Sequence, residues 1–320
     1  MLGAIIGDIV GSRFEFNPTN DYNFEFLSEE CSFTDDTICT IAIADALLKG
    51  KDFGQSLHEW CNRCPNPMGG YGGRFRAWVM SDEPLPYNSF GNGSSMRVSP
   101  VAHWFEDKDE MLAAAAATAA PTHNHEEGIK GAQTVALAIF KAMEYNRGRY
   151  QEAPLHIDEI ISECVRFSCY DINMPKSSVL NRFDETCQGT VPVALKIISM
   201  SLSFEDAVRL AVSLGADADT LGAIVGSIAE AIWGIPLDLR DKVESYLPEE
   251  MKCVLERFYS KRHRSFKSLI DMTFAGIIFN EAAWDLLDSD ERKNIQNDVL
   301  AENNDKRRIM AERAKARLDW

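Results

Sequence analysis

The chain has 320 residues, of which 45% are hydrophobic, and a formal net charge of −16 from 33 basic and 49 acidic side chains. This length and apolar content allow one large domain or two ordinary ones, each with a sizeable core. The negative charge disfavours binding to nucleic acid, which depends on neutralising phosphates, so an anionic ligand would need backbone N–H groups, helix N-termini or cations.

Neither a signal peptide nor a membrane span is expected. Asp8 interrupts the apolar N-terminal run, and no basic segment precedes it. The apolar stretch that ends at Pro236 is broken by Glu230 and falls short of the roughly 20 residues that a span requires. The 8 cysteines lack the spacing of a secreted disulfide framework, and Cys61 and Cys64 are interpreted as structural. We therefore expect a cytoplasmic protein that does not associate with membranes.

Apolar residues recur at helical spacing along most of the chain. In residues 36–49, for example, Ile38, Ile41 and Leu48 fall on one face. Period-two alternation of β-branched residues, the pattern typical of strands, is hard to find. The other helical windows are 110–120, 125–145, 155–170, 191–202, 204–214, 220–233 and 248–259. This pattern predicts an all-α fold.

Clusters of glycine and proline mark three long connections, at 64–75, 81–100 and 120–128. Loops of this size between packed helices are often functional. Beyond Gly276 the chain has no glycine or proline and is highly charged, which predicts a long C-terminal helix. Its sparse apolar stripe favours a surface helix over the alternative, a homo-oligomer or partner contact through residues 277–320.

Two short clusters of Asp and Thr precede helical windows. The first cluster is Thr34, Asp35 and Asp36, and the second is Asp217, Asp219 and Thr220. Capping and the helix dipole explain one such cluster, at about 0.3–1 kcal/mol for each carboxylate. If two clusters converge, however, four carboxylates crowd together, and divalent cations would neutralise them.

The donor atoms of these clusters are all oxygen, which suits Mg²⁺ or Mn²⁺ better than Zn²⁺. Adjacent residues on a helix point ~100° apart, so each carboxylate of a pair could serve a different ion of two that are ~3.5–4 Å apart. The sequence spacing therefore predicts a binuclear oxygen-ligand metal site, on the condition that the two clusters meet in space.

Five motifs occur in order along the chain: GDIVGSRFE (7–15), FTDDT (33–37), GNGSSMR (91–97), THNHEEGI (122–129) and GADADT (215–220). In this set the chain resembles the ADP-ribosylglycohydrolase family over roughly residues 1–255. The resemblance implies a compact orthogonal all-α bundle that binds two Mg²⁺, or Mn²⁺, and cleaves the glycosidic bond between ADP-ribose and an acceptor. We expect a catalytic domain at 1–261 and a helical C-terminal extension at 262–320.

The resemblance also implies roles for individual residues. The metal ligands would be Thr34, Asp35, Asp36, Asp217, Asp219 and Thr220. Glu15 would be an acid or base near the anomeric carbon, and the alternative is that it only ligates a metal. Asp36 is also expected to be catalytic. His123 would contact the diphosphate or the ribose.

A glycine-rich segment is the expected diphosphate site, because small residues let backbone N–H groups approach phosphate closely. Its residues are Gly91, Asn92, Gly93, Ser94, Ser95 and Met96. Arg97 either pairs with phosphate or braces the loop. Tyr71 either stacks on adenine or fills the core beside a turn.

We expect a Mg²⁺-dependent hydrolase that releases ADP-ribose from arginine in a protein. The alternatives are hydrolysis of serine-linked or small-molecule ADP-ribose conjugates, or an immunity or binding module that blocks a partner through the ADP-ribose cleft and the C-terminal extension. The residues that select the acceptor lie in loops, whose geometry a sequence does not give.

Overall fold

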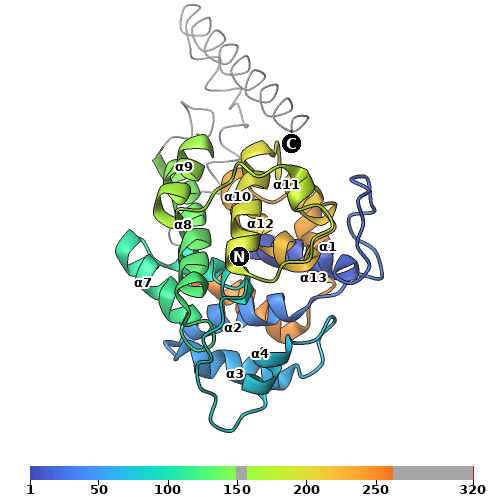
Figure 1. The fold of residues 1–320 in the computed structure, drawn as a ribbon. Coiled ribbons are helices and arrows are strands. Elements are labelled where there is room, and N and C mark those ends of the chain that lie inside the picture. Colours follow the sequence, from blue (N-terminus) through green and yellow to red (C-terminus); the bar gives the residue numbers. More distant parts are fainter. Residues whose placement is uncertain (149–156, 262–319) are drawn as a thin grey trace, which may run out of the picture.

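The computed structural model describes residues 1–148 and 157–261 together with Trp320, and across these residues it contains helices and no β-strand (Figure 1). The only pairing of strand type among them is an isolated antiparallel bridge between Gly91 and Thr186. The all-α prediction is confirmed. The predicted helix at 277–320 lies outside the described residues apart from Trp320, whose indole N–H donates to the Met174 carbonyl at 3.1 Å.

The main helices, in chain order, are α1 (Leu2–Gly11), α2 (Asp35–Lys49), α3 (Phe53–Arg63), α4 (Gly73–Val79), α5 (Gly93–Met96), α6 (Ser99–Trp104), α7 (Lys108–Ala119), α8 (Glu126–Gly148), α9 (Ile157–Ser168), α10 (Cys187–Met200), α11 (Phe204–Val212), α12 (Ala218–Trp233) and α13 (Leu237–Glu244). Short 3-10 turns, η1 (Ser12–Phe14) and η2 (Lys176–Ser178), lie in the connections, and a further helix covers 249–261. In Figure 1, α8 and α12 stand beside each other, with α2 and α3 across their lower ends.

Each helical window predicted from the sequence contains a helix of the structure. Outside the predicted windows lie α1, α13, α3, α4, α5 and α6, and the last three begin inside segments expected to be loops. Helices of 4 to 7 residues, such as these three, carry too few turns for apolar periodicity to show. The helical windows therefore included every described helix longer than 11 residues, and they missed α1, α3 and α13 as well as the short helices around the glycine-rich segments.

The backbones of α1 and α12 touch at a crossing lined by glycine. A Cβ atom on Gly7 would lie 1.9 Å from the Gly222 carbonyl oxygen, and one on Gly222 would lie 2.5 Å from the Gly7 oxygen. One turn away, a Cβ on Gly11 would lie 2.3 Å from the Ala218 oxygen. Only hydrogen atoms fit in these spaces, so glycine sets how closely the end of α1 approaches the start of α12.

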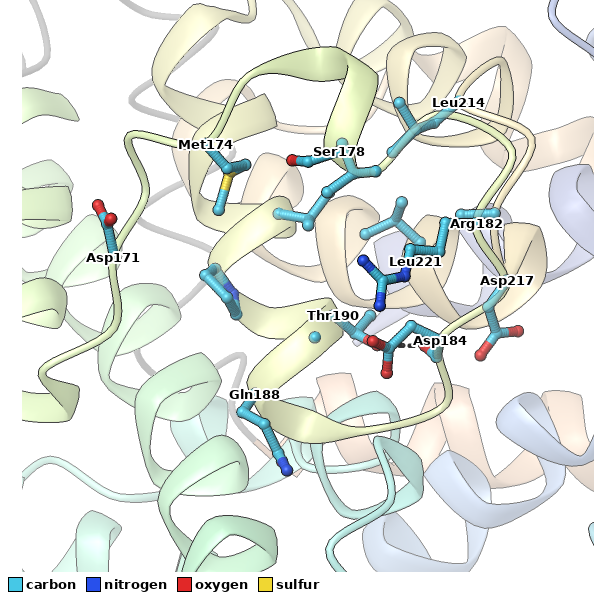
Figure 2. Close-up of a pocket in the computed structure, with 15 residues that line it drawn as sticks. Asp171, Met174, Ser178, Arg182, Asp184, Gln188, Thr190, Leu214, Asp217 and Leu221 are labelled. Carbon is cyan, nitrogen blue, oxygen red and sulfur yellow. Dashed lines mark hydrogen bonds between the residues drawn. The ribbon is translucent and has the colours of Figure 1, made fainter.

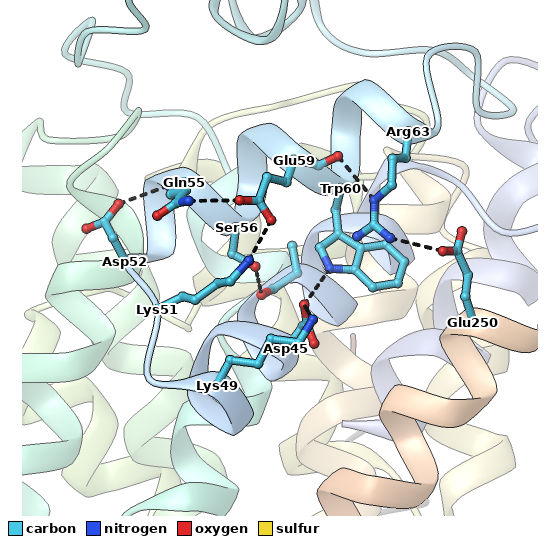
Figure 3. A network of polar contacts seen from close by, with 11 residues as sticks. Asp45, Lys49, Lys51, Asp52, Gln55, Ser56, Glu59, Trp60, Arg63 and Glu250 are labelled. Carbon is cyan, nitrogen blue, oxygen red and sulfur yellow. Dashed lines mark hydrogen bonds and ion pairs between the residues drawn. The ribbon is translucent and has the colours of Figure 1, made fainter.

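A polar network fixes α3 on α2 and on the helix at 249–261 (Figure 3). The buried Trp60 indole donates to Asp45 Oδ2 at 3.1 Å. The Arg63 guanidinium lies 3.9 Å from the centre of the Trp60 ring and donates to Glu250 at 3.0 Å. Asp45, Trp60, Arg63 and Glu250 therefore form one chain of contacts. Through Asp45 this network stabilises α2, the helix that carries the first acidic cluster.

Gly7→Ala should destabilise the fold by more than about 2 kcal/mol, because the added methyl group must push two helix backbones apart. The free energy of unfolding in urea measures this change. Gly73→Ala is the matched control, since a Cβ at Gly73 meets nothing within 4 Å, and it should change stability by less than about 0.5 kcal/mol. Equal effects of the two substitutions would contradict the close-contact argument.

Candidate metal centre

Thr34 caps the start of α2, as its position in the sequence predicted. Its backbone is extended, with φ of −108°, and its side chain accepts from the Asp36 N–H at 3.2 Å. The cap places Asp35 and Asp36 in the first turn of the helix, where the dipole favours carboxylates. Asp36 is buried, whereas Asp35 keeps part of its surface in solvent.

Asp8, which the site prediction missed, links α1 to the start of α2. It is fully buried and accepts from the backbone N–H groups of Thr34 and Thr37, at 3.0 and 3.1 Å, and from both of their hydroxyls. A charged residue inside an otherwise apolar helical run was the signal for it in the sequence. Asp8 thereby holds the first acidic cluster against α1.

The two acidic clusters meet in the structure. Asp217 caps α12 by position and Asp219 lies in its first turn, and the Thr220 hydroxyl faces Asp36 Oδ1 at 3.4 Å. The Asn92 side chain donates to Asp217 Oδ2 at 2.7 Å, so the glycine-rich segment joins them. The metal prediction required that these two segments, about 180 positions apart in the sequence, lie close together, and in the structure they do.

Burial and mutual repulsion strongly perturb these carboxylates. Burial first, and then the neighbouring acidic charges, raise the pKa values of Asp35, Asp36 and Asp219. Burial raises the pKa of Asp8 to about 6 and that of Asp217 to about 7 although both accept hydrogen bonds. In the part of the chain that the structure describes, none of the five forms an ion pair with Lys or Arg.

The chemistry of these donors fits a hard divalent cation. Among the residues that the structure describes, Asp36 Oδ2 and Asp219 Oδ1 are buried and have no hydrogen-bond partner, and a buried unpaired carboxylate oxygen is costly. A cation such as Mg²⁺ prefers oxygen ligands of this type. Among the described residues, no three His, Cys, Asp or Glu side chains are already gathered into a metal-binding group, so the ligand set remains a prediction.

Glu15 lies at the edge of this carboxylate cluster, directly after the 3-10 turn η1. It is half-buried, and burial together with the charges of Asp219, Asp8 and Glu185 raises its pKa to about 8. Gly69, with φ of +76°, packs against it, and a Cβ there would lie 2.2 Å from Glu15 Oε2. The loop at 64–72 therefore fixes the position of the carboxylate that the sequence singled out as acid or base.

Several side chains of the glycine-rich segment contact other parts of the protein. The Ser94 hydroxyl donates to the Gly128 carbonyl at 2.7 Å, the Ser95 hydroxyl lies 3.3 Å from Cys187 Sγ, and Met96 is buried. These three side chains anchor the segment to α8 and α10. The sequence did not distinguish such anchors from ligand-facing residues.

The His123 ring lies beside the two glycines of this segment. A Cβ on Gly93 would lie 3.1 Å from His123 Nε2, and one on Gly91 would lie 3.4 Å from it. The ring is buried, its Nδ1 is 2.7 Å from the Thr122 hydroxyl, and burial followed by the charges of Arg97 and Arg74 lowers its pKa. His123 therefore remains neutral next to Gly91 and Gly93.

Arg97 and Tyr71, for which the sequence left a ligand-binding and a structural role open, have structural contacts. The buried Arg97 donates to the Thr118 carbonyl at 2.9 Å and to the Thr122 hydroxyl at 2.8 Å, so it braces the loop. Tyr71 is 9% exposed, and its hydroxyl donates to the carbonyls of Cys61 and Cys64. Tyr71 fills the core beside the turn, and its predicted adenine contact finds no support in this placement.

A pocket of about 230 Å³ adjoins the cluster and shares Asp217 with it (Figure 2). Its polar wall also includes Arg182, Asp184 and Thr190. The apolar wall is formed by Met174, Val179, Pro192, Val193, Leu214 and Leu221. The segment at 171–193, which follows α9, therefore forms one side of the site.

The fold and the site define an all-helical protein with a buried carboxylate centre at the starts of two helices. The chain belongs to the ADP-ribosylglycohydrolase family, whose model matches residues 1–267, and this membership indicates ADP-ribosyl glycohydrolase activity. None of the helices in the described residues is long and apolar enough to cross a membrane.

Named relatives agree with this assignment, and a solved structure has a similar fold. An ADP-ribosylarginine hydrolase, Tri1, from Pseudomonas putida is 25% identical over 73% of this chain and 70% of its own length. ADP-ribosylhydrolase ARH3 from Bos taurus is 24% identical over 77% of this chain and 88% of its own. A structure described as an ADP-ribosylglycohydrolase-related protein complex has a similar fold, with a TM-score of 0.60 and 24% identity over 81% of this chain and 95% of that one.

Without metal, the protein should lose stability as pH rises. The folded pKa values of about 6 for Asp8, 7 for Asp217 and 8 for Glu15 lie above the ordinary 3.8, 3.8 and 4.5. The folded state then binds more protons, so these groups contribute full stability below pH ~4 and lose it as pH rises through about 6–8. Melting temperatures measured in EDTA at constant ionic strength should fall from pH 5 to pH 8.

Asp217→Asn should flatten this pH dependence, whereas the exposed Asp241→Asn should leave it unchanged. A melting temperature in EDTA that rises across the same window would show that burial and neighbouring charges do not raise the pKa values of these carboxylates in the folded protein.

Proposed function

We propose that this protein uses two Mg²⁺ ions to release ADP-ribose from arginine side chains of a modified protein. The observation that carries the proposal is the pair of buried, unpartnered oxygens, Asp36 Oδ2 and Asp219 Oδ1, which belong to two different helix starts. Two like-charged groups held together in this way are costly for the metal-free fold and suit cation binding.

The proposed ligands are the six oxygen-bearing residues of the two clusters. They are Thr34, Asp35, Asp36, Asp217, Asp219 and Thr220. Mn²⁺ has the same ligand preference as Mg²⁺ and is the proposed alternative ion. When bound, such ions neutralise the carboxylates and lower the pKa of a bound water.

Glu15 is the proposed acid or base. Its carboxylate is half-buried at the edge of the cluster and fixed by the loop that contains Gly69, so it can hold or move one proton at Oε2 beside the reacting bond. Glycosidic cleavage develops positive charge on the ribose ring, and nearby carboxylates stabilise that charge. Asp36 serves this second purpose as well as being a proposed ligand.

The glycine-rich segment is the proposed diphosphate contact, through Gly91, Gly93 and the neutral His123 ring. Because Gly93 has no side chain, a phosphate oxygen can approach its backbone N–H closely beside the His123 ring, whereas the Gly91 N–H already donates to the Ser89 hydroxyl at 3.1 Å. Asn92 would connect this segment to the proposed metal ligands, since its side chain donates a hydrogen bond to Asp217.

Arginine is the proposed acceptor partly because the similar protein from Pseudomonas putida is named an ADP-ribosylarginine hydrolase. Other relatives carry the name ARH3, which does not specify an acceptor. Serine-linked or small-molecule conjugates are therefore the second candidates, and a partner-blocking role through the cleft and the segment beyond 261 is the third. The partner in the first two cases is the ADP-ribosylated molecule itself.

Wild-type protein should release free ADP-ribose from an arginine-ADP-ribosylated protein in Mg²⁺ and not in EDTA. Asp36→Asn and Asp219→Asn should each reduce the rate about 100-fold or more, because each removes a charged ligand from the same site. The exposed Asp241→Asn is the control and should retain wild-type activity. Chromatographic detection of ADP-ribose gives the rates.

Each result other than the expected one would contradict a different part of the proposal. Loss of activity in only one cluster variant would contradict a shared centre. Release from serine-linked or small-molecule conjugates alone would replace arginine as the acceptor. Binding of ADP-ribose without release from any conjugate would favour the partner-blocking role.

Glu15→Gln should lower kcat by about 10²–10⁴-fold, because the amide cannot transfer the proton. The variant should keep the Mg²⁺-dependent rise in melting temperature, which reports ion binding to the folded state. Recovery of full activity at saturating Mg²⁺ would show that Glu15 acts only as a ligand.

A further inference from the structure

Two exposed phenylalanines stack on each other at the edge of the candidate site. Phe16 is 72% exposed and Phe183 is 45% exposed, and their ring centres lie 6.2 Å apart with an interplanar angle of 29°. The rings come from segments 167 positions apart in the sequence. Large aromatic surface kept in water on a monomer commonly marks an interaction site.

The chain connectivity places this pair beside the carboxylates. Phe16 directly follows Glu15, the proposed acid or base. Phe183 lies two residues before Glu185, whose carbonyl accepts from the Asn92 N–H at 2.7 Å. Because the side chain of the same Asn92 contacts Asp217, the segment that carries Phe183 is tied directly to the cluster.

The surroundings of the pair are acidic. The exposed Glu185 lies close enough to raise the pKa of both Glu15 and Asp217 by its charge. Arg182, although next to Phe183 in sequence, turns into the pocket of Figure 2, where it lines the wall with Asp184. The two rings therefore come from the same segments as Glu15 and Glu185, whose charges interact with each other.

Aromatic faces bordered by carboxylates complement a guanidinium group. Its planar cation stacks on aromatic rings, and its N–H groups bind carboxylates with matching geometry. The protein itself contains such an arrangement, because the Arg209 guanidinium lies 5.2 Å from the centre of Phe24 and 5.0 Å from that of Phe26.

We propose that Phe16, Phe183 and Glu185 form the acceptor-recognition surface, on which the guanidinium of an ADP-ribosylated arginine lies during hydrolysis. This inference rests on the proposed function and goes further by assigning the residues that select the acceptor. An uncharged acceptor, such as a serine oxygen, gains neither the cation–π contact nor the ion pair at this surface.

The test compares substitutions that remove the aromatic face but keep apolar volume. Phe16→Leu and Phe183→Leu should each raise KM for an ADP-ribosylarginine conjugate about 10-fold, and Glu185→Gln should do the same at low salt. Phe16→Trp, which presents a stronger aromatic face, should keep KM at or below the wild-type value. Isothermal titration should show that each variant binds free ADP-ribose, which has no acceptor group, within about twofold of wild type.

The matched control is Phe167→Leu, which changes another exposed phenylalanine, 39% exposed on α9, and it should leave KM unchanged. An unchanged KM in both leucine variants would overturn the inference, as would an equal loss of affinity for free ADP-ribose. Both of those results leave wild-type activity intact, so they are distinct from failure of the proposed function. Wild-type protein that hydrolyses no ADP-ribose conjugate would contradict the proposed function and, with it, this inference.

Discussion

The direct contact between the α1 and α12 backbones is the constraint on which the site depends. Gly7 and Gly222 leave no room for a Cβ atom at the crossing, and this contact continues to Gly11 and Ala218. The end of one helix and the start of the other are thereby held together. Asp219 lies at the second of these ends and is positioned by helix packing. Glu15 follows the first end, so its position depends on this packing together with the loop that contains Gly69.

Asp8 connects a further helix, α2, to the α1–α12 contact. Its carboxylate accepts hydrogen bonds from Thr34 and Thr37, and these bonds fix the helix start that carries Asp36. The cost is a further buried negative charge, and it adds to the repulsion felt by Asp36 and Asp219. A fold that keeps such an unfavourable group of charges together sacrifices stability at the proposed site of its chemistry.

The parts of this structure that the sequence predicted are those encoded locally. Thr34 at a helix start is a capping signal that needs no knowledge of the rest of the chain. By contrast, the inward hydroxyl of Ser94 and the core position of Tyr71 depend on partners that are far apart in the sequence or in loops of irregular backbone. The stacking of Phe16 on Phe183 is another contact of this kind, which no spacing rule reveals. The convergence of the two acidic clusters came from the family resemblance, because residue types alone left it as a condition.

The rigid and the variable parts of the site have different consequences for function. In the proposed function, helix starts held by glycine contacts and by Asp8 position the glycosidic bond, and their geometry does not depend on the acceptor. The aromatic pair and Glu185 lie on connections between helices, where substitutions leave the helix packing untouched. If acceptor choice resides there, as we propose, a change from a cationic to an uncharged acceptor requires only the loss of an aromatic face and one carboxylate. The same carboxylate centre can then serve several linkages, because the fold supplies the reaction and the connections supply the specificity.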